Sequence, residues 1–402
     1  RRTLESLAIR GAVDVRARLN RPAGLKRQLT IRLDGQFVDS SVRFQHFPWP
    51  IETIRGEFSA TISPTRYAWR FETLSGQHAD ASLAGSGHLD GQPGRPGLFV
   101  LDLDAQHIRL DQDLRAACSD ELRGLWDRVR PTGRLNGRIA IRRQGTQPVQ
   151  VAIPRFTIDG GTMQLTGFPY KLSDLSATGS YDITKTGQRR LTLSSLNARH
   201  ENTRLATRGL LEIDQRKDWM LRLESLACND LVANDDLLQA LPPRLRQTIS
   251  HLNPQRTFHL GGLIELRGAG EPGFPITAAW DLETHLPGNR LTTGVQLEDV
   301  SGKVTSRGKW YGQHAEMNGN FSLDSASLWG YQFRDIQGPF HYRNQDLVIG
   351  SNQAFAPQAT TKRRLAIPLQ ERVTAKAIGG LFTLDAQARI DQQSTYHVKL
   401  NM

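Results

Sequence analysis

A six-residue pattern returns three times along the chain and constrains its fold more than any other feature. Each copy reads glycine, any residue, apolar, any residue, apolar, arginine, and the copies begin at Gly11, Gly137 and Gly262. The interval of about 125 residues is longer than a propeller blade or a leucine-rich repeat. Alternation of apolar with polar residues is typical of a strand with one buried face. The sequence therefore predicts successive β-rich repeats.

Longer segments follow a similar interval. FPWPIETI, which starts at Phe47, matches FPYKLSDL, which starts at Phe168, and the stretch at 74–89 matches the one at 196–211. The tetrapeptide GQHA occurs at 76–79 and again at 312–315, so we interpret it as part of the repeat. This alignment assigns equivalent places to three histidines, which are His78, His200 and His314. One histidine in each long repeat cannot form a shared coordination sphere, so we expect a turn or strand-end role and no metal site.

Within the repeats, apolar residues alternate in LFVLDLDA at 98–105, RLTLSS at 190–195, AAWDLE at 278–283 and GLFTLDAQAR at 380–389. These runs predict strands. Three glycine-containing triplets separate such runs, and we interpret them as turns: DGG at 159–161, PGN at 287–289 and NGN at 318–320.

Two segments have helical spacing instead. Apolar residues recur at helical intervals over 111–130 and 234–253, and Asp111/Asp113 and Asp235/Asp236 precede them. Carboxylates at these places are typical of helix capping, which explains them better than acid–base catalysis. Pro243 is expected to begin a new helix. Each helix has one apolar stripe, so we expect the Leu122/Leu125 and Leu245/Ile249 faces to pack on the sheet as lids.

The sequence thus predicts a mainly β protein, an elongated array of antiparallel repeats of about 120 residues that form a curved, groove-like sheet with short amphipathic helices at repeat boundaries. The expected repeats are 1–130, 131–254 and an atypical third one, 255–402, which lacks a terminal helix and continues beyond this chain. Three separate β-sandwiches are the alternative. The chain begins with Arg1, and we interpret it as a piece of a longer protein.

The net charge of the chain favours some classes of binding partner over others. Lys and Arg number 51 against 40 Asp and Glu, which gives a net charge of +11. Such a balance favours anionic partners, either lipid headgroups or nucleic acid, and it is also common where arginines cover solvated strands. The two cysteines, Cys118 and Cys228, are not in a metal-binding spacing. No stretch approaches the roughly 20 apolar residues of a membrane span.

No enzyme is predicted. The sequence contains no GxSxG, Walker or HExxH motif. Seven tryptophans are spread over apolar positions, which favours core packing over a stacking platform for nucleic acid. We therefore expect no catalytic residue, no cofactor, no metal and no nucleic-acid partner.

The repeat units resemble those of the AsmA-like/TamB family. FPYKLSDLSATGSYD at 168–182, RLTLSSLNARHENTRLATRGLLEI at 190–213, VQLEDVSGKV at 295–304 and FRDIQGPFHYRNQDLVIGS at 333–351 carry the resemblance. It implies a repeating β-groove lipid-transfer fold in a bacterial cell envelope, on the periplasmic side of the inner membrane, with a part in outer-membrane biogenesis. The cargo would be phospholipid acyl chains, and membrane attachment would use parts of the parent protein not present here. No partner protein follows from it.

The expected function is non-catalytic binding or conduction of phospholipid along the apolar side of the groove, between bacterial envelope membranes. Two alternatives remain open: a structural or adhesive scaffold with a closed core, and a basic surface for acidic glycan or nucleic acid. The groove candidates share the alternating apolar positions. They are Val13, Val15, Leu101, Leu103, Ile139, Ile141, Leu191, Leu193, Ile264, Leu266, Trp280 and Leu282.

Overall fold

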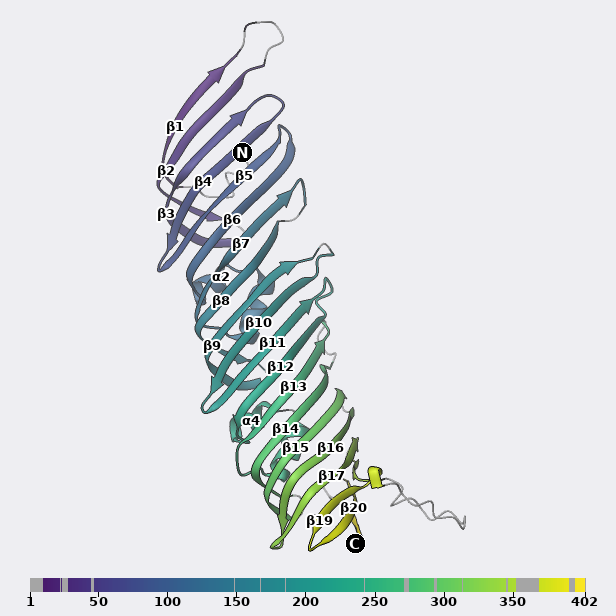
Figure 1. Cartoon of the computed structure of the whole chain (residues 1–402). Helices are drawn as coiled ribbons and strands as arrows, with labels where there is room; N and C mark the ends of the chain where they lie inside the picture. Colours follow the sequence, from purple (N-terminus) through teal and green to yellow (C-terminus); the bar gives the residue numbers. More distant parts are fainter. Residues whose placement is uncertain are drawn as a thin grey trace. The chain divides into compact units, whose positions relative to one another are not determined.

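The computed structural model describes residues 10–401 apart from 22, 24–27, 45–46, 148, 167, 185, 242, 271–274, 293–294, 313, 345, 352–368 and 390–394. The chain is mainly β, with strands in antiparallel ladders and a few short helices, as the sequence predicts (Figure 1). Contacts divide it into two compact units. Unit 1 comprises residues 1–166 and 171–195, and unit 2 comprises 167–170 and 196–402.

The strands of unit 1 pair in chain order. Registers from β1 to β8 are antiparallel throughout. The strands are β1 (Arg10–Asn20), β2 (Thr30–Phe44), β3 (Phe47–Ile62), β4 (Tyr67–His78), β5 (Ala81–Gln92), β6 (Arg95–Arg109), β7 (Arg134–Gln144) and β8 (Gln150–Leu165). Next come β9 (Phe168–Ile183) and β10 (Arg189–His200), and each of these has residues in both units.

Unit 2 repeats this plan from β11 to β17. Its strands are β11 (Thr203–Ile213), β12 (Trp219–Leu231), β13 (Phe258–Gly268), β14 (Thr277–Thr292), β15 (Gln296–Tyr311), β16 (His314–Leu328), β17 (Tyr331–Arg343), β18 (Asp346–Ile349), β19 (Val373–Ala377), β20 (Gly380–Arg389) and β21 (Thr395–Asn401). Both β18 and β19 pair with β17 on one side and β20 on the other.

The element order itself is periodic. Among the described residues, six strands precede the helices α2 (Gln112–Ala117) and α3 (Asp120–Val129), and six more precede α4 (Asp235–Ala240) and α5 (Pro243–Leu252). A third run of six strands, β13–β18, is followed by the short 3₁₀ helix η2 (Leu369–Glu371). The compact units divide the chain inside the second run, so they do not coincide with the repeat boundaries expected at 130 and 254.

Each unit is a single layer of strands. In the described residues, all strand pairs with substantial contact are hydrogen-bonded neighbours, and the other elements that touch the strands are helices. Packed β-sandwiches would bring strands from facing sheets together. The structure therefore favours the open sheet over three sandwiches.

Bulges bend the strands. Residues with left-handed backbone interrupt the ladders and precede an inward side chain, as in Asp299 (φ 50°) before Val300 and Asp335 (φ 50°) before Ile336. A bulge adds one residue to one strand of a pair and sharpens its twist. The strands curve toward the side that carries the helices (Figure 1). In unit 1, we call the part of the sheet that carries Trp49, Ala105 and Ile108, next to α2, the covered arm. The part that carries Val15, Phe58 and Leu101 is the open arm. The same names are used for the corresponding parts of unit 2.

The three triplets interpreted as turns lie inside strands, which corrects the sequence-based prediction. DGG is in β8, PGN in β14 and NGN in β16. Gly160 (φ 62°) and Gly288 (φ 74°) adopt left-handed conformations within their strands, and the ladder shifts around Gly288. Gly319 is instead covered by the Phe340 ring, since an added Cβ would lie 2.3 Å from it. Glycine in a strand marks a bulge or a close approach as readily as a turn.

Both helical segments are present, and each is split in two. Asp111 caps α2 by accepting the Asp113 and Leu114 amides, while Asn234 caps α4 by accepting the Leu237 amide. Helix α5 begins at Pro243, as expected. The division at Ser119, which caps α3, was not predicted.

The lid prediction is right for one residue of each pair and wrong for the other. Helices α3 and α5 contact β8 and β14, and Leu125 and Ile249 are half-buried. Leu122 and Leu245 are exposed, with 40% and 46% of their surface accessible. Buried residues belong to the shorter first helices, namely Ala117 in α2 and Leu237 and Ala240 in α4. Because α2 and α4 have only six residues each, their sequences carry a weaker helical period than those of α3 and α5.

A buried ion pair links the residues that flank β18 and β19 to β20. Asp385 in β20 is fully buried, accepts the Ser351 amide at 3.0 Å and pairs with the Arg372 guanidinium. Ser351 follows β18 and Arg372 precedes β19, so one carboxylate of β20 holds the residues next to both strands. A buried charge is tolerated when it is paired and hydrogen-bonded in this way.

Candidate functional site

A continuous row of directly opposed residues crosses the open arms of unit 1. The registers place successive members of the row opposite one another, so their side chains project from the same face. The row runs Val15, Gly35, Phe58, Phe71, Gly87, Leu101, Ile141 and Val151. Each member is apolar or glycine. Most are half-buried, and Val15 at the β1 end is 53% exposed.

Unit 2 has a corresponding row. It runs Gly209, Leu223, Ile264, Trp280, Gly308, Met317 and Tyr342 from β11 to β17. Parallel to it, Leu211, Leu221, Leu266, Ala278, Trp310 and Ala315 are opposed in turn. We call these surfaces, one in each unit, the apolar rows.

Several candidates chosen from the sequence are members of these rows, and others lie beside them on the same face. In unit 1, Val13 is opposite Phe37, and Leu103 is opposite Ile139. In unit 2, Leu282 is opposite Ser306, two residues beyond Trp280. Leu191 and Leu193 alternate on β10 and are half-buried, but the registers described above do not reach them.

Aromatic rings over glycines form part of the surface, and sequence reasoning missed them. The Phe58 ring covers Gly35 and the Trp280 ring covers Gly308, so closely that an added Cβ would lie 2.5 and 2.3 Å from ring atoms. A ring can lie flat on a neighbouring strand only where that strand has no side chain. The signal in the sequence was an aromatic residue on one strand with a glycine on the next at the paired position.

In unit 1 the rings also contact each other. Phe58 lies 5.2 Å from Phe37 and 6.1 Å from Trp69, and Trp69 stacks with Phe71 at 6.3 Å with an angle of 12°. Offset rings at such separations attract beyond their burial. The open arm therefore has an apolar surface held in place by lateral contacts.

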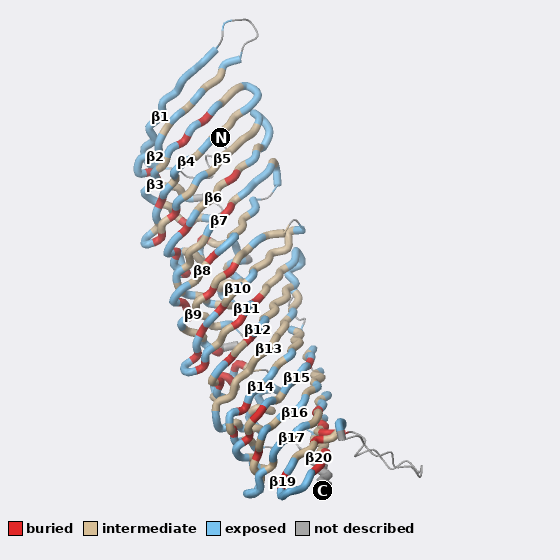
Figure 2. The backbone as a smooth tube through the Cα atoms, in the orientation of Figure 1, coloured by how far each residue is buried: buried red, intermediate tan, exposed pale blue. Residues whose placement is uncertain are grey.

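The covered arm has a core closed by a helix, whereas most row members of the open arm are only half-buried. Trp49, Ala105 and Ile108 are at most 5% exposed and form a core with Ala81, Leu83 and Ala117 of α2. Leu103 and Ile139 pack against the edge of this core. Figure 2 shows that β1, by contrast, is exposed along its whole length.

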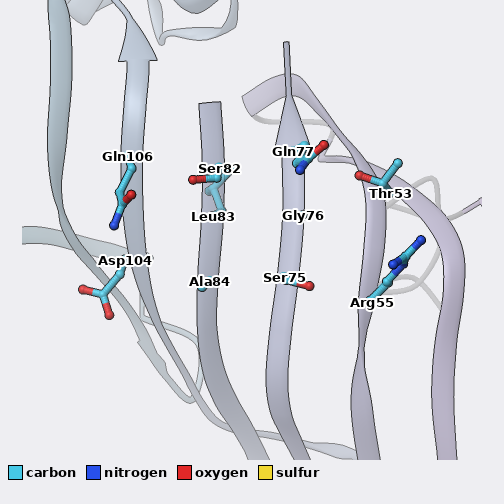
Figure 3. A pocket seen from close by; sticks show the side chains of 10 residues that line it. All are labelled: Thr53, Arg55, Ser75, Gly76, Gln77, Ser82, Leu83, Ala84, Asp104 and Gln106. Atoms are coloured by element: carbon cyan, nitrogen blue, oxygen red, sulfur yellow. The ribbon is translucent and has the colours of Figure 1, made fainter. Parts of the chain in front are cut away.

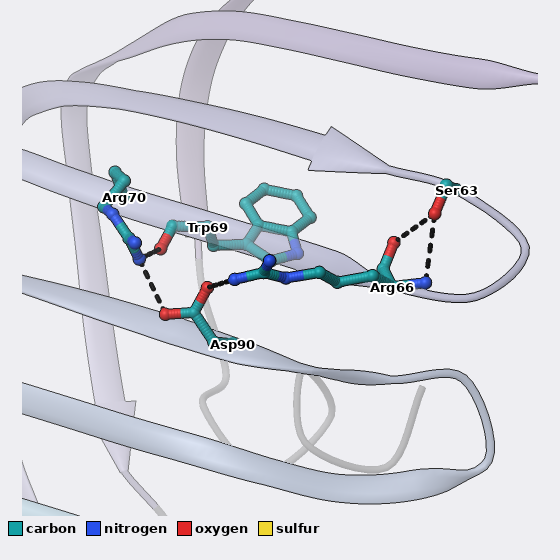
Figure 4. Close-up of polar contacts among 5 residues, drawn as sticks. All are labelled: Ser63, Arg66, Trp69, Arg70 and Asp90. Atoms are coloured by element: carbon teal, nitrogen blue, oxygen red, sulfur yellow. Dashed lines mark hydrogen bonds and ion pairs between the residues drawn. The ribbon is translucent and has the colours of Figure 1, made fainter.

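The opposite face of the open arm is charged. Arg16, Asp34 and Arg70 lie on it, and Arg70 donates to Asp90 at 2.8 Å, with Arg66 3.6 Å away (Figure 4). The hydrogen bond from Arg70 lowers the pKa of Asp90 below its ordinary value, and the charges of Arg70, His88 and Arg66 add to the effect. Ion pairs such as Arg307–Asp281 lie on the corresponding side of unit 2.

A shallow hollow of about 390 Å³ lies across strands β3 to β6 (Figure 3). Its walls are small polar side chains with one carboxylate and one guanidinium: Thr53, Arg55, Ser75, Gly76, Gln77, Ser82, Leu83, Ala84, Asp104 and Gln106. Arg55 already pairs with Asp39 at 3.2 Å. The lining includes the hydroxyl groups of Thr53, Ser75 and Ser82 and no thiol or imidazole group.

Two of the three repeated histidines share a place in the fold. His78 ends β4, packs on Trp49 at 4.3 Å and bonds the Pro50 carbonyl at 2.8 Å. His200 ends β10 and stacks on Tyr170 at 3.7 Å. Because Trp49 and Tyr170 occupy matching positions in the FPWP and FPYK segments, the sequence match correctly identified this pair.

His314 does not belong to the set, which corrects the alignment. It begins β16 rather than ending a strand and lies beside Tyr311 and Asn344. In the order of strands, the hairpins β4–β5 and β10–β11 correspond to β16–β17, so the third equivalent of His78 is Leu328. The second GQHA is therefore a chance match of short sequence.

His200 is 3.4 Å from Asp236, and Cys228 lies in the same part of unit 2, but these groups do not form a nucleophilic site. Burial raises the pKa of the Cys228 thiol to about 11. A catalytic cysteine needs the opposite shift, because the thiolate is the nucleophile. Among the described residues, no group of three His, Cys, Asp or Glu side chains is arranged to hold a metal ion.

None of the described helices has the length and apolar character to cross a membrane. No family model matches the chain, and no curated protein or solved structure matches it. The resemblance to the AsmA-like/TamB family is therefore carried by the repeat segments alone.

Proposed function

We propose that the apolar rows bind the acyl chains of phospholipids, and that the protein holds or conducts lipid without catalysing a reaction. The main support is that the rows are continuous, apolar and not covered by a second layer in the described residues. An apolar sheet face normally packs against another layer. Lipid is a cargo whose chains would take the place of that layer.

The dimensions of the row suit such a cargo. Eight strands about 4.8 Å apart give the unit 1 row a length of roughly 34 Å. A bilayer core of about 30 Å contains two opposed acyl layers, so one chain needs roughly half that length. Each covered methylene contributes about 0.8 kcal/mol, and chains are thus held without a polar contact, while headgroups remain in water.

The charged side chains lie on the other face, and this supports lipid over the scaffold with a closed core. On the open arm Phe58 and Ala60 are buried beside neighbouring rings, at 8% and 4% exposed. The other row members Phe71, Leu101, Ile141 and Val151 are only half-buried, whereas a sealed core would bury them as it does Ala105, which is 2% exposed. The proposed place of action is the bacterial cell envelope, between its membranes, and it rests on the family resemblance of the repeat segments.

The test compares charges placed on the two faces. Leu101→Glu puts a carboxylate in the row, and Val15→Glu does so at a site already more than half exposed. Ala84→Glu and Thr61→Glu are controls on the exposed, polar side of the same sheet. Delipidated protein is incubated with phospholipid vesicles and examined by native mass spectrometry.

Wild type and both controls are expected to carry phospholipid. The two row variants should bind at least about tenfold more weakly, because an unpaired charge under an acyl chain costs several kcal/mol. Val15→Glu keeps the test informative if Leu101→Glu fails to fold. A wild-type protein that takes up no phospholipid, or row variants that bind as well as the controls, would exclude the proposal.

A further inference from the structure

Two neighbouring hairpins of unit 2 present large apolar side chains at their tips. Trp329 in the β16–β17 turn and Ile378 in the β19–β20 turn are each 78% exposed, and Tyr331 and Leu381 beside them are 57% and 49% exposed. We call these four residues the apolar tip. The strands β17 and β19 pair at Arg334 and Lys376, three residues from Tyr331 and Gly379, so the two turns lie side by side.

The backbone conformation of the two turns is unfavourable for these apolar residues. Trp329 and Ile378 have φ of 50° and 49°, and each precedes a glycine with positive φ, Gly330 or Gly379. Two-residue turns of this kind favour Asn-Gly or Asp-Gly. A bulky or β-branched residue with left-handed φ is an outlier, and such outliers cluster where function requires them.

The corresponding turns of the earlier repeats differ. The β4–β5 turn has Ala79 (φ 48°) and Asp80, and the β10–β11 turn has Glu201 (φ 51°) and Asn202. The same conformation is therefore occupied by small or polar residues twice and by tryptophan in the third repeat. The fold does not demand an apolar residue there.

We propose that the apolar tip inserts into the interface of a phospholipid bilayer that contains anionic lipid. Tryptophan and tyrosine favour the headgroup level of a bilayer, where an apolar ring and a polar edge are both accommodated. Four side chains at a protruding turn offer far less area than the roughly 800 Å² per partner of a stable protein interface. A membrane has no such requirement.

The charge next to the tip matches this partner. Leu381 is opposite Lys376, which is opposite Arg334 on the next strand. Arg334 donates to the neutral amide of Gln332, while Lys376 pairs with Asp335 at 2.9 Å. The described contacts therefore leave a net positive charge behind the tip, which anionic headgroups attract.

The full chain is tested with large unilamellar vesicles of 1-palmitoyl-2-oleoyl phosphatidylcholine, with and without the corresponding phosphatidylglycerol, in a flotation assay. The key variant is Trp329→Asn with Ile378→Asn, because Asn-Gly suits both turns and the fold is not threatened. Leu19→Asn is the matched control, since Leu19 is 67% exposed but lies on β1.

Wild type and Leu19→Asn should float with the anionic vesicles, and the double variant should partition on the order of tenfold less while its melting temperature stays the same or rises. Brominated lipid should quench wild-type tryptophan fluorescence more than that of Trp329→Asn. The inference fails if wild type does not float, or if the double variant floats equally well.

It also fails if the double substitution turns a dimer into a monomer in sedimentation without affecting flotation, since the tip would then be a contact between copies. Binding to vesicles at the tip is independent of lipid uptake by the apolar rows. A double variant that loses flotation but still carries phospholipid in native mass spectrometry separates the two proposals.

Discussion

The covered and open arms of the same strands differ in how their apolar faces are protected. On the covered arm of unit 1, Trp49 and Ile108 are buried under α2. On the open arm, Phe58 and Trp69 are held by rings and glycines beside them, and no helix lies over them in the described contacts. One part of the apolar surface is thus closed by a helix and another is not, and the proposal of a lipid cargo rests on this difference.

The largest effect should come from a charge introduced under a covering helix. Leu237 of α4 is 7% exposed, whereas Leu245 of α5 is 46% exposed. Leu237→Asp buries an unpaired carboxylate, so the free energy of unfolding should fall by more than about 3 kcal/mol. Leu245→Asp should lower it by less than about 1 kcal/mol. Urea unfolding at neutral pH measures both, and equal losses would contradict the division between α4 and α5.

A smaller effect is expected on the open arm when the space that an aromatic ring occupies over a glycine is filled by a methyl group. Gly308→Ala places a methyl group against the Trp280 ring, which must move, and this should cost about 1–3 kcal/mol of unfolding free energy. Gly261→Ala is the control, because the atom nearest to its added methyl group, the Leu226 carbonyl oxygen, would be 3.4 Å away. Thermal unfolding of both variants measures the difference. If Gly308→Ala is as stable as the control, the rings do not organise the open arm.

The smallest effect concerns the charged face behind the open arm. The pKa of Asp90 is lowered in the folded protein, so its ionised form stabilises the fold above the unfolded pKa, and this contribution is lost as pH falls through the folded pKa. Asp90→Asn should cost about 1 kcal/mol or less at pH 7, since the arginine partners are largely solvated. The gap between variant and wild type should close below about pH 4. Urea unfolding at several pH values would show a gap independent of pH if Asp90 acted through packing instead.

The sequence predicted the strands and the repeat, because alternation is a local signal that one face of a strand imposes directly. It also predicted that Leu101 and Ile141 share one face, and the register of β6 and β7 places them opposite each other. It could not identify the partnership of Phe58 with Gly35, which depends on the register between two strands. The same limitation explains why the glycines of PGN and NGN were interpreted as turns.

The helices show a second limit of prediction from the sequence, which concerns burial. The periodic pattern of α3 and α5 was evident in the sequence. However, a stripe of apolar residues does not determine how deeply each of its side chains is buried against the sheet. Leu245 was expected to be covered, yet the neighbouring short helix α4 supplies the buried Leu237. Which of two adjacent helices is buried is decided by tertiary packing and not by local periodicity.

The Asp385 clamp has a consequence for how this chain can vary. Because one carboxylate holds Ser351 and Arg372 to the same strand, the pairing of β18 and β19 with β20 does not depend on how many residues connect them. Loop length costs little free energy when the ends are fixed. Between Ser351 and Arg372, residues can therefore be gained or lost in evolution, or a foreign domain grafted by design, without shifting the register of the sheet.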